Sequence, residues 1–126
     1  MVISNDGITP QPLEINYSRE SRRLRVSFAS GEIFEYSAEY LRVHSPSAEV
    51  RGHGPGQEVL QTGKEGVGIE AIEPVGHYAV RLRFDDGHAS GLYAFSELYR
   101  LGRDQPALWR DYLARLEAAG VQRKAP

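Results

Sequence analysis

The stretch RLRVSFASGEIFEY, residues 23–36, predicts a β-hairpin from which the rest of the fold can be worked out. Apolar and polar residues alternate on both sides of the Ala-Ser-Gly segment that ends at Gly31, which is the pattern of two half-buried strands. A three-residue loop with Gly31 in the left-handed region sets Val26 opposite Phe34, so that one face of the hairpin is apolar. A two-residue loop would set Val26 opposite Glu35, and we therefore expect the three-residue loop.

A second block of sequence repeats this plan. Residues 80–84 alternate apolar and polar side chains, residues 85–87 (Asp-Asp-Gly) indicate a turn, and residues 88–95 are expected to supply the returning strand. The tyrosine of the returning strand recurs, since Tyr93 corresponds to Tyr36, and a short helical turn follows each hairpin. We interpret the chain as a hairpin-plus-helix unit that is used twice.

Two further strands and a helix complete the predicted fold. Leu13 and Ile15 alternate with polar residues and indicate a first strand, and residues 69–72 indicate another strand that Pro74 ends. Residues 105–119 place apolar side chains at helical spacing, with a proline near the start and a glycine just past the end. The expected packing residues of this helix are Leu108, Tyr112, Leu113 and Leu116. The prediction is an α+β fold of small antiparallel β-hairpins with a short helix and a C-terminal amphipathic helix.

The chain of 126 residues has the length of a single domain. We expect its core to lie within about residues 8–101, followed by the C-terminal helix, with residues 1–7 and 121–126 as loose ends. Between the two repeated units, residues 45–68 hold six of the thirteen glycines and show little periodicity. A loop of this length inside a compact domain is usually functional or mobile.

Composition narrows the possible classes of function. Seventeen acidic residues against fifteen Lys and Arg leave a net charge of −2, which provides no electrostatic footprint for nucleic acid or an anionic membrane. No apolar run approaches the length of a membrane-spanning helix, and residues 1–10 lack the order of a signal peptide. The absence of cysteine excludes disulfides, thiolate catalysis and cysteine-based metal sites. We expect a cytoplasmic protein that binds neither nucleic acid nor membrane.

No standard catalytic motif occurs in the chain. The P-loop and the Gly-x-Ser-x-Gly motif are missing, and none of the four histidines stands in a standard metal-binding pattern. These histidines are His44, His53, His77 and His88. A small enzyme would have to use His88 and Asp86 as an acid–base pair, which requires a pocket that brings the two side chains within hydrogen-bond reach.

The densest polar cluster is the turn formed by residues 85–88. Asp and Gly are the residues that such turns require, so the cluster has a purely structural interpretation. A functional alternative is that His88 points toward the Gly-rich loop and shares a zinc or iron ion with His44, Glu49 or His53. Without cysteine such a site would bind its metal weakly.

Three motifs carry a resemblance to a known family. They are LRVHSPSAE at residues 41–49, GHYA at residues 76–79 and FDDGHASGLY at residues 84–93. Over about residues 8–101 the chain resembles the gamma-butyrobetaine hydroxylase-like N-terminal domain, a bacterial domain of unknown function. The resemblance implies a small α+β domain that occurs alone, in front of carnitine-pathway hydroxylases, or fused to iron–sulfur carrier ATPases.

The resemblance also implies where a metal would be held. In the hydroxylases a structural zinc is bound by a cysteine cluster and by a histidine of the second hairpin turn. The comparable positions of this chain are Ser45, Ser47 and Val50, and His88 matches the histidine. Because three ligands are replaced, we expect no resident cofactor, and we expect hydrogen bonds from Ser45 and Ser47 to tie the loop instead. The iron and 2-oxoglutarate residues of the hydroxylases lie in a separate catalytic domain, so their activity does not transfer.

We therefore predict a non-catalytic binding or accessory module with a protein partner, linked to iron–sulfur carrier or oxygenase systems. Its contact surface is expected to include Arg42, the loop around His53, and Asp85, Asp86 and His88 of the turn. The alternative is the zinc- or iron-binding protein centred on His88.

Overall fold

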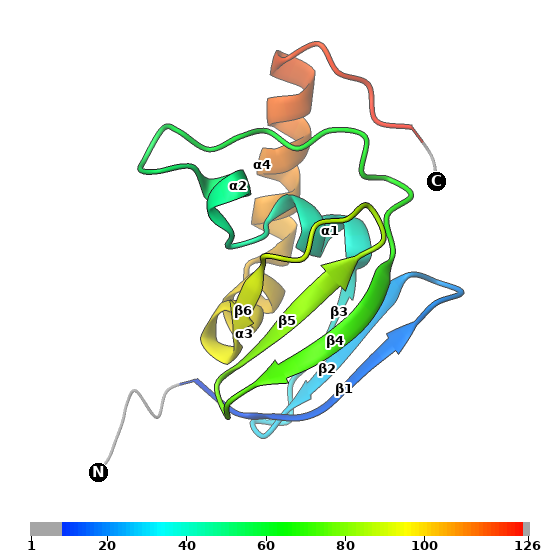
Figure 1. The fold of residues 1–126 in the computed structure, drawn as a ribbon, viewed down its shortest axis with the longest axis vertical. Coiled ribbons are helices and arrows are strands. Elements are labelled where there is room, and N and C mark those ends of the chain that lie inside the picture. Colours follow the sequence, from blue (N-terminus) through cyan, green and yellow to red (C-terminus); the bar gives the residue numbers. More distant parts are fainter. Residues whose placement is uncertain (1–8, 125–126) are drawn as a thin grey trace.

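The computed structural model describes residues 9–124, which form two three-stranded antiparallel sheets and four helices (Figure 1). The first sheet has the order β1-β2-β3, with strands at Pro12–Ser18, Arg23–Phe28 and Ile33–Ser37. The second has the order β4-β5-β6, with strands at Ile69–Val75, Ala79–Phe84 and Leu92–Ala94. The helices are α1 at Ala38–Val43, α2 at Ala48–Arg51, α3 at Phe95–Arg103 and α4 at Gln105–Ala118. The predicted α+β class is confirmed.

The register of the first hairpin is the predicted one. Val26 lies opposite Phe34, and Gly31 has a φ of 94°. The amide of Gly31 donates to the carbonyl of Phe28, and the amide of Phe28 donates to the carbonyl of Glu32, each at 2.9 Å. The three-residue loop is therefore confirmed, and glycine is the residue that takes this φ without strain.

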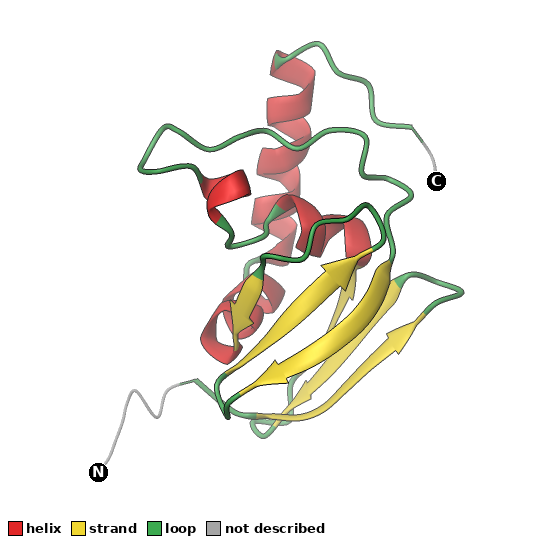
Figure 2. Ribbon diagram, viewed as in Figure 1, coloured by secondary structure: helices red, strands yellow, loops and turns green. Residues whose placement is uncertain are grey.

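One buried cluster joins the two sheets to the helices. The apolar sides of β2 and β5 contribute to it, and side chains of α1 and α3 complete it. Its largest fully buried members are Tyr36, Tyr40, Tyr93, Phe28, Phe84, Leu24, Leu41, Leu82, Leu98 and Leu101. Figure 2 shows α1, α2 and α4 beyond one end of the strands, where the long loop after α2 also runs.

The two halves of the chain follow one plan, three strands and then a helix, and hydrogen bonds cross between them. Tyr36 of β3 donates its hydroxyl proton to the carbonyl of Leu98 in α3, at 2.7 Å. Tyr93 of β6 donates in turn to the carbonyl of Leu41 in α1. Each half therefore binds the helix of the other half through equivalent residues. The predicted internal repeat is confirmed.

The second hairpin departs from the prediction after its turn. The turn closes as in the first hairpin, with Phe84 paired to His88. After it, two residues, 89 and 90, lie opposite the single residue Arg83 of β5, which is a β-bulge. Such a bulge interrupts the pairing and redirects the side chains next to it, here that of His88. The returning strand is shorter than the expected 88–95 for this reason, and β6 spans only Leu92–Ala94.

Pro74 does not end the strand that precedes it, contrary to expectation. It lies inside β4, opposite Val80 of β5. Because β4 is an edge strand of its sheet, a residue without an amide proton can be accommodated there.

The C-terminal helix lies where the sequence predicts it, although one of its packing residues does not. Tyr112 and Leu116 are buried in a second small cluster, and Leu108 packs against the main one. Leu113 is 39% exposed, because only one side of α4 meets the rest of the protein. Neither α4 nor any other helix within residues 9–124 combines the length and apolar character needed to cross a bilayer.

Residues 121–124, which we expected to form a loose end, contact the rest of the protein. Arg123 forms an ion pair with Glu39 of α1, with Nε 2.8 Å from Oε2, and its guanidinium carbon lies 5.4 Å from the ring centroid of Trp109. The other expected loose residues, 1–7 and 125–126, lie outside the described part of the chain.

Candidate functional site

Three segments that are distant in sequence meet around Asp86, at the tip of the second hairpin. Asp86 Oδ2 accepts a hydrogen bond from Nε of Arg42 in α1 at 2.8 Å and another from Nζ of Lys64 in the long loop at 2.6 Å. Arg42 also donates to the side-chain oxygen of Gln61 at 3.1 Å. The side chains of Arg42 and Asp86 are only 8% and 21% exposed. This partly desolvated ion pair holds the loop and the hairpin against α1.

The negative charge of Asp86 is stabilised by these contacts. Partial burial raises its pKa, but hydrogen bonds from Lys64, the backbone amide of His88 and Arg42 outweigh burial and lower the pKa to about 2. Asp86 is therefore ionised at neutral pH. Its contact with His88 uses the backbone amide, at 3.1 Å, so the two side chains do not form the acid–base pair that we considered.

His88 is the centre of a second group of contacts. Its Nε2 lies 2.9 Å from Ser45 Oγ, and its Nδ1 lies 3.1 Å from Glu49 Oε1, which also accepts a hydrogen bond from the Ser90 hydroxyl at 2.7 Å. The bulge in the second hairpin turns both His88 and Ser90 toward these partners. Burial lowers the pKa of His88, and the charge of Arg42 lowers it further, so the imidazole is mainly neutral at pH 7.

The order Ser45, His88, Glu49 is that of a hydrolytic Ser–His–acid triad, but the burial is reversed. In a triad the serine oxygen faces the substrate and the acid is buried. Here Ser45 is 0% exposed and the side chain of Glu49 is 71% exposed. A Cβ on Gly91 would lie 2.5 Å from Ser45 Oγ, which shows how closely the chain covers this hydroxyl. The three residues therefore tie α1, α2 and the hairpin together, and Ser45 has no access to a substrate.

The structure brings together three of the five predicted binding residues. Arg42, Asp86 and His88 belong to one cluster, whereas His53 is exposed on the long loop. Asp85 has a different contact, because its Oδ1 accepts a hydrogen bond at 3.0 Å from the amide of the residue before β4. We expected Arg42 on the contact surface. In the structure it is buried and supports the turn through its bond to Asp86.

Sequence reasoning missed two residues of this cluster, Lys64 and Gln61. They lie in a segment without periodicity, where nothing local indicates which part of the chain folds back onto α1. The one available signal is composition, because Lys64 is one of only two lysines in a chain that otherwise uses arginine.

The set of metal ligands that we considered as an alternative is not assembled. Nδ1 of His44 bonds the carbonyl of Tyr40 at 2.9 Å, and His53 is exposed in the loop. Of the expected partners, Glu49 contacts His88. Within the described residues, 9–124, no group of three or more His, Asp or Glu side chains is placed to hold a metal ion.

Comparison with known proteins decides the family. The family described as gamma-butyrobetaine hydroxylase-like, N-terminal, matches residues 15–99, which is well over half of the chain. The chain belongs to this family. The resemblance found in the sequence motifs is thereby confirmed.

Solved structures of similar proteins agree with the fold. One structure determined by NMR is 49% identical, with a TM-score of 0.81, and the match covers 98% of this chain and 92% of the other. A second NMR structure is 45% identical, with a TM-score of 0.79 and coverages of 94% and 93%. A crystal structure of a protein of unknown function in the DUF971 family, from Acidithiobacillus ferrooxidans, is 40% identical, with a TM-score of 0.63 and coverages of 73% and 92%. No curated protein matches the chain.

The zinc that the family resemblance implies does not fit the side chains of this member. Ser45 is hydrogen-bonded to His88, and Val50 has no donor atom. The Ser47 hydroxyl is buried without a hydrogen-bond partner, and neutral hydroxyls are poor zinc ligands compared with thiolates. The predicted tie between loop and hairpin is made by Ser45 and not by Ser47.

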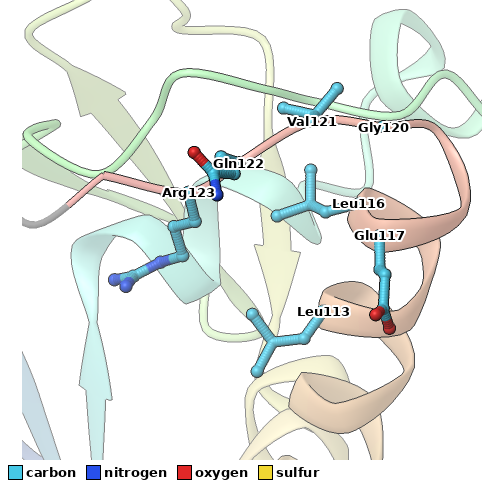
Figure 3. A pocket seen from close by; sticks show the side chains of 7 residues that line it. All are labelled: Leu113, Leu116, Glu117, Gly120, Val121, Gln122 and Arg123. Atoms are coloured by element: carbon cyan, nitrogen blue, oxygen red, sulfur yellow. The ribbon is translucent and has the colours of Figure 1, made fainter.

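Arg42, Asp86 and His88 line none of four surface hollows that lie among the described residues. The largest of the four has a volume of about 480 Å³ and lies where residues 120–123 run back along α4 (Figure 3). Leu113 and Leu116 face Val121 across it. The hydrogen bonds described for Asp86 are made within the protein, to Arg42, Lys64 and the backbone of His88.

Proposed function

We propose that this chain is a non-catalytic accessory module that binds a protein partner through the surface around the second hairpin turn. The observation that carries the proposal is that the ionisable groups of this surface form hydrogen bonds within the protein. Asp86 is hydrogen-bonded to Arg42 of α1 and to Lys64 of the long loop, and His88 is hydrogen-bonded to Ser45 after α1. These bonds hold α1, the long loop and the hairpin in one arrangement. A surface that is fixed before binding loses little conformational entropy when a partner docks.

The atoms offered to the partner are those exposed at the rim of this cluster, and they are mainly acidic. Glu49 and Asp85 are exposed, and a hydrogen bond from Ser90 lowers the pKa of Glu49, so its charge is retained at neutral pH. His53 is exposed on the loop that Lys64 ties to Asp86. A basic partner surface complements this rim.

The family setting supports the choice of partner. Because related domains are appended to iron–sulfur carrier ATPases and to oxygenases, a protein of one of these cytoplasmic systems is the first candidate.

Glu49→Arg is expected to weaken binding to that partner at least tenfold, because it replaces an acidic side chain of the rim that is 71% exposed by a cation that faces a basic surface. Calorimetric titration of purified full-length chain with a purified carrier ATPase or oxygenase from the same cell measures this. Glu117→Arg, which makes the same charge change on the exposed side of α4, is the matched control and should bind like wild type. Binding that is equal for all three proteins, or that is not seen with any candidate, would contradict the proposed surface.

Ser45→Ala tests the non-catalytic part of the proposal. The wild-type chain and the variant are expected to hydrolyse p-nitrophenyl acetate at the same background rate, because the Ser45 hydroxyl is buried and cannot reach the ester. The measurement is the initial rate of p-nitrophenolate release at pH 7 to 9. A rate that depends on Ser45 would overturn the non-catalytic assignment while leaving the binding surface to be judged by the Glu49 variant.

A further inference from the structure

A second site is formed where α1 and α2 approach α3, α4 and the long loop. The hollow has a volume of about 240 Å³ and is lined by three valines, Val43, Val50 and Val59. Cationic groups from separate elements surround these valines, namely Arg51 of α2, Arg100 of α3 and Arg115 of α4. His44, the C-cap residue of α1, completes the lining together with Glu58. The hollow has no residue in common with the cluster around Asp86.

The guanidinium groups of this hollow are only partly neutralised. One carboxylate, that of Glu97, accepts hydrogen bonds from both Arg51 and Arg100. Nε of Arg115 is buried and lies 3.2 Å from Asp111 Oδ2 in an exposed ion pair, in which the side chains of Arg115 and Asp111 are 40% and 64% exposed. Exposed ion pairs of this kind are weak, so a ligand carboxylate can compete with Asp111 for the guanidinium group.

The state of His44 shows the electrostatic character of the hollow. Its Nδ1 bonds the carbonyl of Tyr40 at 2.9 Å, and a carbonyl can only accept, so Nδ1 carries the proton. Burial lowers the pKa of His44; the Tyr40 carbonyl raises it, and the three arginine charges lower it further. The arginines are the charges that act most strongly on this ring, although Glu58 lines the same hollow.

We propose that this hollow binds a small organic monocarboxylate, with its carboxylate on the arginines and its hydrocarbon part on the valines. The planar guanidinium group matches a carboxylate in shape and charge, and the side chain of Arg115 is 40% exposed beside the valines. The valines require an apolar portion, which inorganic anions lack. The volume is below that of pockets for drug-sized molecules, so the ligand is a short-chain acid. This site is independent of the partner surface proposed above.

Binding of such an anion is coupled to the protonation of His44. A carboxylate in the hollow offsets the arginine charges and therefore raises the pKa of the imidazole, so the affinity increases as the pH falls toward that pKa. The groups that face the ring are the three arginines and Glu58 of the lining, Glu97 and Asp111 beside the arginines, and the uncharged Tyr40 and Tyr112.

NMR titration of the full chain with sodium hexanoate tests the proposal. The ring resonances of His44 are expected to shift and saturate, and the pKa of His44 measured at saturation should lie above that of the free protein. Arg115→Gln should weaken hexanoate binding about tenfold, because it removes one charged donor. Arg110→Gln, the same change at an exposed position of the same helix outside the lining, should leave the affinity unchanged.

Three small probes define the chemistry of the ligand. Acetate, which lacks the hydrocarbon chain, and hexan-1-ol, which lacks the charge, should each bind more weakly than hexanoate. Inorganic phosphate should also bind more weakly than hexanoate. The proposal would be overturned if the His44 resonances show no saturable shift up to about 50 mM hexanoate, well above a millimolar dissociation constant. Equal losses in the two arginine variants, or binding of any probe as tightly as hexanoate, would also overturn it.

Discussion

Replacing Asp86 by alanine is expected to lower the free energy of unfolding by about 3 kcal/mol, because it leaves the buried guanidinium group of Arg42 without its carboxylate partner. Among residues 9–124, the guanidinium group of Arg42, whose side chain is 8% exposed, would keep the side chain of Gln61 as its hydrogen-bond partner. Lys64 would lose its contact with the hairpin at the same time. Chemical denaturation at pH 7, followed by circular dichroism, measures the effect.

Asp111→Ala is the matched control, since it removes the same residue type from an exposed ion pair. The side chains of Asp111 and Arg115 are 64% and 40% exposed, and exposed pairs contribute well under about 1 kcal/mol. If the two alanine variants lose equal stability, the cluster around Asp86 does not hold the fold in the way described.

The loss in Asp86→Ala is also expected to depend on pH. The pKa of Asp86 is about 2 in the folded chain and 3.8 ordinarily, so its charge stabilises the fold fully above pH 4 and this contribution disappears as the pH falls through 2. With allowance for solvent screening, the difference in stability between wild type and variant should shrink by about 1 to 2 kcal/mol over that range. Comparing the two proteins cancels the other carboxylates, and a constant difference from pH 7 to pH 2 would contradict the assignment.

Gly102→Ala is expected to lower the free energy of unfolding by about 2 kcal/mol, although alanine favours helices more than glycine does by about 1 kcal/mol. A Cβ at this position of α3 would lie 2.3 Å from Cδ2 and 2.4 Å from Cγ of Phe34 in β3. Because Phe34 belongs to the packed side of its sheet, the ring cannot move aside without disturbing the core. Thermal and chemical denaturation of the variant measure the loss.

Two comparisons isolate the steric cause. Gly66→Ala places a Cβ where nothing lies within 4 Å, and we expect a change of no more than about 0.5 kcal/mol there. In a double-mutant cycle with Phe34→Leu, the loss at position 102 should become smaller, because the leucine side chain is more flexible than the ring. A loss that is the same in both backgrounds would show that the contact with Phe34 is not the cause.

Much of the fold follows from local patterns. The register of the first hairpin depends on alternation and on one glycine turn, and the structure has Val26 opposite Phe34 as these features require. The second hairpin was only partly predictable, because the bulge at residues 89–90 has no signal in the alternation of the strand. Its effect becomes evident through the contacts that it creates for His88.

The candidate site was predictable as a list of residues and not as a geometry. Asp86 and His88 were singled out because they belong to the polar cluster of the turn at residues 85–88, yet their side chains bond to different partners. Arg42 was expected on the contact surface and lies beneath it, because its charge is matched by Asp86 from a strand turn that is 44 residues away. The hollow around Arg115 had no signal in the sequence, where the polar residues of that helix have the pattern of a solvated face.

By itself the sequence determined the first hairpin, the approximate places of the other strands, the C-terminal helix and the family, since each depends on residues within a few positions of one another or on a contiguous motif. Only the tertiary structure decided which polar groups meet, which of them are covered and which remain open. Ser45, His88 and Glu49 are the residue types of a reactive triad. Because Gly91 packs closely over Ser45, the three residues instead tie neighbouring segments together. The physical reason is that desolvation and contact between distant segments depend on how the two repeated halves fold against each other, which no local pattern contains.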